Sequence, residues 1–367
     1  MIKIPYVNLA KQWATERDEL LPILDKVMSS GQYIGGSIVE AFEKKAAALC
    51  DSKYCVALNS GTDALVLGLA AMGVRRGDEV ITPPNSFVAS TSAITHIGAV
   101  PKFVDVLPDQ NIDPSKIESA ITSKTKAIMP VHLTGRMAQM DEIKKIADKH
   151  NLLIIEDAAQ SIGSMFNNVP SGKWGKVGCF SAHPLKNLNA CGDAGFLVTD
   201  DDEIAEKIKL IRNHGLIDRN TVLEFGYVSR MDAIQAAILN FRIEKLNAVS
   251  AKRRANAALY SQLLDTSSIF IPAETSKEFN TYHTFVIQVN NRDRLKKRLE
   301  EEGIETSIHY PIPIHLQPAA KRLGYTLGDF PETEMQAERI LTLPVNQYLD
   351  LRDIEMIAQR VNFLVKD

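Results

Sequence analysis

The stretch Gly178-Cys179-Phe180-Ser181-Ala182-His183-Pro184-Leu185-Lys186-Asn187 indicates a short apolar strand that ends before Pro184 and leads into a loop. Ser181 and Lys186 stand five positions apart at the end of this strand, and Gly192-Asp193-Ala194-Gly195 marks the turn that follows. A hydroxyl and an amine held together suit a small cofactor that carries both a phosphate and an aldehyde. A solvated loop lysine fits the stretch equally well. A cofactor site is therefore indicated only if other parts of the chain supply residues that could contact the same cofactor.

The sequence around this stretch predicts an α/β fold. From about residue 54, short apolar runs alternate with helical periods; strands are predicted at 54–58, 79–82, 102–105, 126–133 and 152–157, and helices at 63–72, 86–97, around 140–146 and from Asp113-Pro114 onward. Apolar runs without alternation, separated by helices, are typical of a mostly parallel sheet covered on both faces. Such sheets bind ligands beyond the carboxyl ends of their strands.

The two ends of the chain have a different pattern. An amphipathic helix is predicted before Gly31, and after Asp200 we expect helices at 201–213, 232–264, 292–302, 332–341 and 351–365, with strands at 284–289 and 306–310. We therefore expect a large domain over residues 1–246 and a smaller α+β domain over residues 247–367.

Composition excludes several classes of partner. The 367 residues are 45% hydrophobic and 24% charged with a net charge of -3, which gives no electrostatic reason to expect nucleic acid or an anionic membrane as partner.

The four cysteines, Cys50, Cys55, Cys179 and Cys191, form no CxxC pair or metal-ligand spacing, which favours free thiols. Cys50 and Cys55 are close enough for a disulfide, although Cys55 fits a core strand. No signal sequence or run of ~20 apolar residues is present, so we expect a cytoplasmic protein.

Two other strand ends carry candidate ligand contacts. Ser60-Gly61-Thr62 lies between a strand and a helix, where small residues and the free amides of a helix start suit a phosphate. A plain serine N-cap is the alternative there. Asp157 ends an apolar strand, where its carboxylate could pair with a protonated ring nitrogen, although it could also cap the next segment.

Together these sites suit pyridoxal phosphate. The cofactor carries its aldehyde and its phosphate arm on adjacent ring carbons, so one loop with Ser181 and Lys186 can reach both. Phe87 follows the strand at 79–82 and could stack on the ring, although core packing would also account for it. A phosphate site, a carboxylate for the ring nitrogen and a reactive lysine follow one another at successive strand ends.

The chain resembles the DegT/DnrJ/EryC1/StrS family of sugar aminotransferases, within the fold-type I pyridoxal-phosphate enzymes. The matching segments span nearly the whole chain: Pro5-Tyr6-Val7-Asn8-Leu9, Asn59-Ser60-Gly61-Thr62-Asp63-Ala64-Leu65, Val131-His132-Leu133-Thr134-Gly135, Glu156-Asp157-Ala158-Ala159-Gln160, Phe180 to Leu188, Arg212-Asn213-His214-Gly215, Ser229-Arg230-Met231-Asp232-Ala233-Ile234-Gln235-Ala236-Ala237, and His309-Tyr310-Pro311 with His315. The resemblance implies a seven-stranded, mostly parallel sheet in the large domain.

The resemblance also implies a role for each matching residue. Lys186 corresponds to the lysine that forms the internal aldimine, Asp157 to the partner of the pyridine nitrogen, and Gln160 to a contact of the phenolic oxygen. The phosphate ligands would be Gly61, Thr62 and Ser181, Ser60 would be a further cofactor-binding residue, and Phe87 would be the stacking ring. Tyr33, His309 and Tyr310 lie where relatives line the sugar side of the pocket.

The implied reaction is a transamination in which pyridoxal 5'-phosphate cycles with pyridoxamine phosphate. An amino acid, glutamate in most relatives, donates the amino group, and a nucleotide-linked keto-sugar accepts it. Lys186-Asn187-Leu188 followed by Gly192-Asp193-Ala194-Gly195 is more similar to relatives that act on 3-keto sugars, since many 4-keto enzymes carry glutamate in place of Asp193.

Two other functions on the same fold remain as alternatives, and the chain differs from its relatives at one expected cofactor contact. A related sugar 3-dehydratase carries histidine in place of Lys186, and a regulator or binding module on the same fold would lack catalysis. Relatives form a homodimer with shared active sites, in which an asparagine usually reaches the cofactor phosphate of the neighbouring subunit. This chain has Val228 there, and valine cannot donate a hydrogen bond.

Overall fold

A seven-stranded sheet forms the centre of the molecule. The computed structural model describes residues 4–366. The strand order is β1 (Tyr54–Leu58), β9 (Gly195–Thr199), β8 (Val177–Ser181), β5 (Leu153–Asp157), β4 (Thr125–Ile128), β2 (Glu79–Thr82) and β3 (Val100–Phe103). Within this sheet β9 runs antiparallel to both of its neighbours and the other pairs are parallel. The expected mostly parallel α/β sheet is confirmed.

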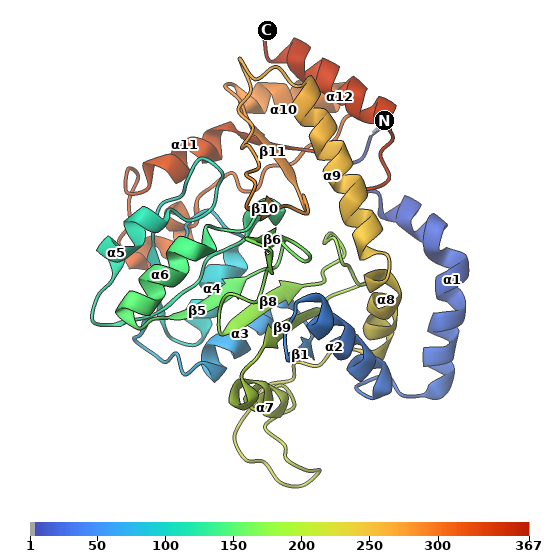
Figure 1. Cartoon of the computed structure of the whole chain (residues 1–367), viewed down its shortest axis with the longest axis vertical. Helices are drawn as coiled ribbons and strands as arrows, with labels where there is room; N and C mark the ends of the chain where they lie inside the picture. The colour runs from blue at the N-terminus through green and yellow to red at the C-terminus, as the bar shows by residue number, and fades with distance from the viewer. Residues whose placement is uncertain (1–3, 367) are drawn as a thin grey trace.

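Helices cover both faces of this sheet (Figure 1). Alternate side chains of β1 point to opposite faces: Val56 and Leu58 join one core cluster, and Cys55 and Ala57 join another. The first cluster includes α3 (Gly61–Ala71), α4 (Val88–His96) and α7 (Asp202–Ile211). The opposite face is covered by α2 (Ser37–Leu49), α8 (Ala233–Ile243), α5 (Ile117–Ala120) and α6 (Met140–His150). The sheet is therefore packed between two apolar layers.

The carboxyl-terminal part has a core of its own. It consists of α9 (Leu246–Leu263), β11 (Phe285–Gln288), α10 (Arg292–Glu301), β12 (Ile340–Leu343) and α12 (Leu351–Leu364), and Ile4 packs into the same cluster. A smaller cluster joins this part of the chain to the large sheet: Ile314 and Phe330, next to α11 (Pro331–Arg339), pack on Phe103 of β3. We keep the proposed domain division at residue 247, at the start of α9.

Several expected elements differ in the structure. The strand predicted at 306–310 is wrong: only Ser307 bridges to Thr342 before the chain enters the Pro311 and Pro313 segment. The helical region predicted at 232–264 is two helices, α8 and α9. The strand predicted at 126–133 ends at Ile128, because Pro130 cannot continue the ladder of hydrogen bonds. The helix expected at Asp113-Pro114 is a short 3-10 turn followed by α5.

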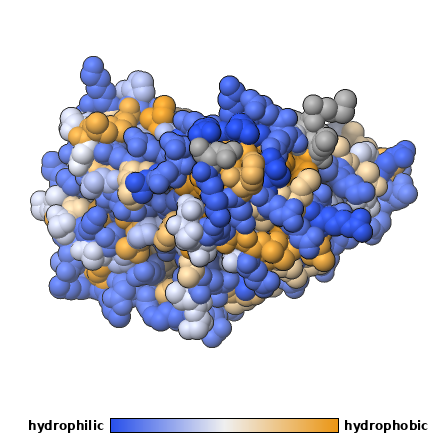
Figure 2. Space-filling model, turned by 90° about the horizontal axis from the view of Figure 1, so that it is seen from above, coloured by the Kyte–Doolittle hydropathy of each residue, from blue (hydrophilic) through white to orange (hydrophobic). Residues whose placement is uncertain are grey.

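The outer surface is mainly polar. Seen from above, hydrophilic residues cover most of the molecule, with small apolar patches between them (Figure 2). Among residues 4–366, no helix combines the length and apolarity that a membrane crossing requires. The same part of the chain contains four free cysteines, and Cys50 and Cys55 form no disulfide.

Candidate active site

A cavity of about 420 Å³ opens at the carboxyl ends of the central strands. The structure brings ten of the eleven predicted site residues into its wall: Ser60, Gly61, Thr62, Phe87, Asp157, Gln160, Ser181, Lys186, His309 and Tyr310. The first eight precede residue 247, where we place the proposed domain division, and the last two follow it. Ligand binding at this edge of the sheet is what a parallel α/β arrangement favours.

One end of the cavity suits an anion. Ser60 caps α3, and its hydroxyl accepts a hydrogen bond from the Asp63 amide at 3.1 Å. The amides of Gly61 and Thr62 begin the same helix and line the cavity, where the helix dipole favours negative charge. Ser181 lies directly opposite, because a Cβ added to Gly61 would come within 2.7 Å of the Ser181 Cβ. The Gly61 backbone at the start of α3 is thus close enough to Ser181 for the two residues to contact one phosphate.

Glycine is also required on the neighbouring strand. A Cβ at Gly195, the first residue of β9, would lie 2.2 Å from the carbonyl carbon of Ser60. The turn after Lys186 therefore passes directly beneath the start of α3, and a side chain at Gly195 would displace the proposed anion site.

Asp157 contributes a buried carboxylate at the end of β5. Its side chain is 4% exposed, accepts a 2.6 Å hydrogen bond from Ser90 Oγ and a 3.2 Å bond from the Ala159 amide, and lines the cavity. Burial raises the pKa of Asp157, and the two donors and the Lys186 charge oppose that rise. A cationic group entering the cavity would be a natural partner for this carboxylate.

Lys186 contributes an amine with an unusual protonation equilibrium. Its backbone amide donates to the His183 carbonyl at 2.8 Å, which folds the loop so that the side chain reaches the cavity. Burial lowers the pKa of Lys186 to about 8, and Asp157 acts in the opposite direction. Within residues 4–366 the Lys186 Nζ has no hydrogen-bond or ion-pair partner. A sizeable fraction of the amine is therefore uncharged and nucleophilic near neutral pH.

The remaining predicted residues form an aromatic and polar wall. Phe87 is 55% exposed, and its ring lies 5.8 Å from that of Tyr310. Gln160 accepts from the Thr134 amide at 2.8 Å and donates to the Tyr310 hydroxyl at 3.4 Å. His309 bonds Thr342 Oγ1 at 3.0 Å, and burial lowers the pKa of its imidazole to about 4, so His309 is neutral at pH 7.

Tyr33 is the predicted residue that the structure does not bring to this cavity. Its side chain is 52% exposed and donates to the Met28 carbonyl at 3.3 Å, just after α1 (Leu9–Ser30). A contact between Tyr33 and a substrate in this cavity would have to come from another copy of the chain.

Sequence reasoning did not assign a role to several wall residues. Tyr6, Arg253, His283 and Asn346 line the cavity, and Ser90 supports Asp157 from behind. Tyr6 lies in a segment that resembles the family, but Arg253 and Asn346 come from helical and loop segments without a local motif. Ser90 and Arg253 lie within the helices α4 and α9, where no local sequence motif marks them as site residues.

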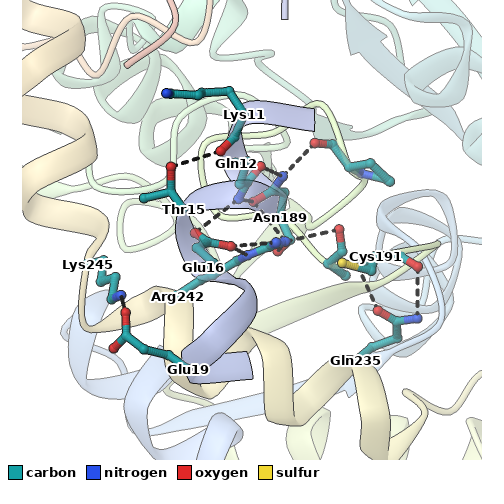
Figure 3. A network of polar contacts seen from close by, with 12 residues as sticks. Lys11, Gln12, Thr15, Glu16, Glu19, Asn189, Cys191, Gln235, Arg242 and Lys245 are labelled. Carbon is teal, nitrogen blue, oxygen red and sulfur yellow. Dashed lines mark hydrogen bonds and ion pairs between the residues drawn. The ribbon is translucent and has the colours of Figure 1, made fainter. Parts of the chain in front are cut away.

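A buried polar network holds the loop that carries Lys186 (Figure 3). Arg242 of α8 donates to Glu16 of α1 at 2.8 Å and to the Asn189 carbonyl at 2.8 Å. The side-chain amide of Asn189 donates to the Pro184 carbonyl at 2.7 Å and bonds Gln12 at 3.0 Å. The loop from Pro184 to Ala190 is thereby tied to two helices distant in sequence.

The site fits pyridoxal phosphate in each of its chemical parts. The α3 start and Ser181 suit the phosphate, Asp157 suits a protonated ring nitrogen, Phe87 presents an aromatic face and Lys186 presents the amine. The glycines at positions 61 and 195 keep open the space that side chains would fill. The fold and the site together define a fold-type I pyridoxal-phosphate enzyme.

Comparison with known proteins gives the family. The model of the DegT/DnrJ/EryC1/StrS aminotransferase family matches residues 14–362, and the chain belongs to this family. A protein of Geobacillus stearothermophilus named pleiotropic regulatory protein is 40% identical over 98% of both chains. An Acidithiobacillus ferrooxidans protein named UDP-N-acetyl-3-dehydro-alpha-D-glucosamine 3-aminotransferase is 40% identical over 97% of this chain and 96% of its own.

Solved structures agree with the same class. DesV of S. venezuelae, in complex with a ketimine intermediate, has a TM-score of 0.97 at 36% identity and covers 100% of both chains. A Bacillus subtilis protein with bound cofactor PMP has a TM-score of 0.90 at 35% identity, over 96% of this chain and 82% of its own. The protein is a pyridoxal-phosphate-dependent aminotransferase whose cofactor cycles with pyridoxamine phosphate.

Proposed function

We propose that the enzyme transfers an amino group from glutamate to a nucleotide-linked 3-keto sugar. The observation that carries this proposal is the cavity itself, where the free amine of Lys186 and the buried carboxylate of Asp157 share one opening with the polar wall of His309 and Tyr310. The amine and carboxylate serve transamination, and the small-domain wall offers hydrogen-bonding groups for a sugar.

Each residue has a specific task in this proposal. Pyridoxal phosphate, when bound, withdraws electrons from the carbon that loses its proton. Lys186 acts as the general base that removes the proton from the α-carbon of the donor and later acts as general acid. Its pKa of about 8 suits both directions of proton transfer near neutral pH. Asp157 holds positive charge at the ring nitrogen, and Ser90 keeps Asp157 oriented.

Two features support the C3 position. Asp193 lines the cavity in the turn after Lys186, where many relatives that act on 4-keto sugars carry glutamate. The Acidithiobacillus ferrooxidans relative is named as a 3-aminotransferase. Product NMR after incubation with a panel of nucleotide-linked keto-sugars tests the assignment, and an amine at C4 would contradict it.

The basic test of function is spectroscopic. Purified enzyme should be yellow, glutamate should bleach that band, and Lys186→Ala should remove both the colour and turnover. The Geobacillus stearothermophilus relative is named a pleiotropic regulatory protein. A regulator without catalysis would show no bleaching with any amino acid. A dehydratase would release a deoxygenated sugar and no amino-sugar, which the same NMR assay distinguishes.

We also propose a cytoplasmic homodimer with shared active sites. The segment from Asn213 to Arg230 projects from the molecule below α7 (Figure 1), and it exposes Phe225 at 99% and Leu223 at 67%. Apolar side chains this exposed favour contact with a second copy of the chain. Val228 is 55% exposed in this segment, so a donor other than residue 228 would have to reach the neighbour's phosphate. The free thiols are compatible with a reducing compartment.

A further inference from the structure

Arg253 differs from the other buried arginines. Four arginines in residues 4–366 are at most 7% exposed: Arg136, Arg242, Arg253 and Arg292. Arg242 contacts Glu16 at 2.8 Å, Arg292 contacts Asp293 at 2.6 Å, and Arg136 lies 3.6 Å from Glu278. Arg253, in the first half of α9, is 4% exposed and has no carboxylate partner within the described chain. A buried charge without a counter-charge is costly, so an anion bound beside Arg253 would stabilise it.

The hydrogen bonds of Arg253 leave one edge of the guanidinium free. Nη1 donates to the carbonyls of Tyr282 and His283, both at 3.1 Å. Nε is buried without an acceptor, and among residues 4–366 no acceptor lies in hydrogen-bonding reach of Nη2. The two carbonyls fix the orientation of the side chain, and the Nε–Nη2 edge is the side of the fork that binds a carboxylate through two parallel hydrogen bonds.

Arg253 lies in the same part of the cavity as Lys186. Both residues line the main cavity, and both also border the small recess between Val7 and Asn346. His283 lies near the two cations, because its carbonyl accepts from Arg253 Nη1 at 3.1 Å and it lines the same cavity as Lys186. Burial first, and then the charges of Lys186 and Arg253, lower the pKa of His283. Burial lowers the pKa of Arg253 to about 10, with only the phenols of Tyr6 and Tyr348 opposing, so it stays a cation at neutral pH.

We propose that Arg253 binds the α-carboxylate of the amino donor through its free guanidinium edge. The proposal rests on the aminotransferase function proposed above. In an amino acid the carboxylate and the reacting amine share one carbon, so a receptor for this carboxylate must lie beside the position of Lys186. The diphosphate of a nucleotide-sugar is separated from the reacting carbon by the sugar, and it carries a bulky nucleoside. A guanidinium that is only 4% exposed suits the smaller anion.

The test compares glutamate with its two amides as donors in the first half-reaction. The rate of each reaction is measured as the bleaching of the holoenzyme's yellow band. Isoglutamine lacks the α-carboxylate, whereas glutamine lacks only the side-chain carboxylate. Wild-type enzyme should react with isoglutamine roughly tenfold to a hundredfold less efficiently than with glutamate, the loss expected for a charge-assisted hydrogen bond. Arg253→Gln should slow the glutamate reaction by a similar factor and leave the isoglutamine reaction unchanged, so that the ratio falls toward one.

Two further variants separate binding from folding. Arg254→Gln removes the adjacent arginine, which pairs with Glu274 at 2.7 Å outside the cavity, and it should keep the wild-type ratio. Arg253→Lys keeps the charge and loses the fork, so it should give an intermediate ratio even if Arg253→Gln does not fold. Titration with UDP should give the same affinity in wild type and Arg253→Lys, within about twofold.

The outcomes distinguish this inference from the general function. A wild-type enzyme that glutamate does not bleach would overturn the donor proposal and this inference together. If glutamate bleaches the wild type and its advantage over isoglutamine survives in both Arg253 variants, only the role of Arg253 is wrong. If the Arg253 variants lose affinity for UDP while the glutamate-to-isoglutamine ratio stays unchanged, the proposed role is also wrong. Arg253 would then bind the nucleotide.

Discussion

The hydroxyl of Ser90 donates a hydrogen bond of 2.6 Å to Asp157 Oδ2, linking the first turn of α4 to the end of β5. Ser90 is 1% exposed and does not itself line the cavity, yet its hydrogen bond favours the charged form of the carboxylate that faces the cavity. A residue outside the wall thus controls the electrostatics within it.

Replacing Ser90 by alanine should move the acid limb of the kcat/KM profile to higher pH. The hydrogen bond lowers the pKa of Asp157 against the effect of burial, so its loss should raise that pKa further. Asp157 would then be protonated at a higher pH, and activity would disappear earlier on acidification. Ser92→Ala, on the same helix with a partly exposed side chain, is the control and should keep the wild-type profile. An unshifted limb in Ser90→Ala would contradict the assignment.

The reaction of cofactor-free enzyme with pyridoxal phosphate should depend on the protonation of Lys186. Because the pKa of this lysine is lowered to about 8, the uncharged amine increases as pH rises through that value. The rate at which the yellow colour appears should therefore reach half its maximum near pH 8. Asp157→Asn removes the charge that raises the pKa of Lys186, so the half-point should move below that of wild type. A half-point near that of free lysine would show that the amine is solvated.

Breaking the buried pair of Glu16 and Arg242 should destabilise the protein strongly. Both side chains are under 10% exposed, and Glu16→Gln leaves the guanidinium without its counter-charge, which costs about 3–5 kcal/mol in the free energy of unfolding. Lys245 and Glu19 form a matched, exposed pair at 2.6 Å that also joins α1 to the region of α8 (Figure 3). Glu19→Gln should cost about 0–1 kcal/mol. Urea unfolding of both variants measures the difference, and equal losses would contradict it.

Charge placed on the projecting segment should dissociate the proposed dimer. Phe225→Asp puts a carboxylate on a side chain that is 99% exposed in one subunit, where we expect the second subunit to cover it. Light scattering should report a dimer for wild type and a monomer for Phe225→Asp at micromolar concentration, with a parallel loss of activity. Leu327→Asp, at a 76% exposed position outside this segment, should remain dimeric. A monomeric wild-type enzyme with full activity would disprove the shared site.

The strand ends were predictable from the sequence because their residues stand in local motifs. Asp157 follows an apolar strand and Lys186 follows a strand and a proline, so each has a position in the sheet before any tertiary contact is known. Arg253 and Ser90 were not predictable, since each lies on a helix and reaches the site only through packing against distant segments. The Ser307 region was mistaken for a strand because its apolar and hydroxyl residues have strand propensity, while one bridge to Thr342 is all that forms.

The small antiparallel elements were also missed. Strands β6 (Met165–Phe166), β7 (Val169–Pro170) and β10 (Glu278–Phe279) form a separate three-stranded sheet of two-residue strands. Runs this short have no periodicity to detect, and their partners are more than a hundred residues apart in the case of β6 and β10. The pairing of β10 with β6 joins segments on either side of the proposed domain division at residue 247.

The connection of Glu16, Arg242 and Asn189 ties the first helix to the loop that carries Lys186. A thermal fluctuation that detached α1 would remove the counter-charge of Arg242 and one of the contacts that hold Asn189, and with them the restraint on the loop that presents the reactive amine. Amide hydrogen exchange in the 184–190 loop should therefore follow the opening of α1, long before the sheet unfolds. Protease cleavage within the first thirty residues would inactivate the enzyme while leaving its central sheet intact.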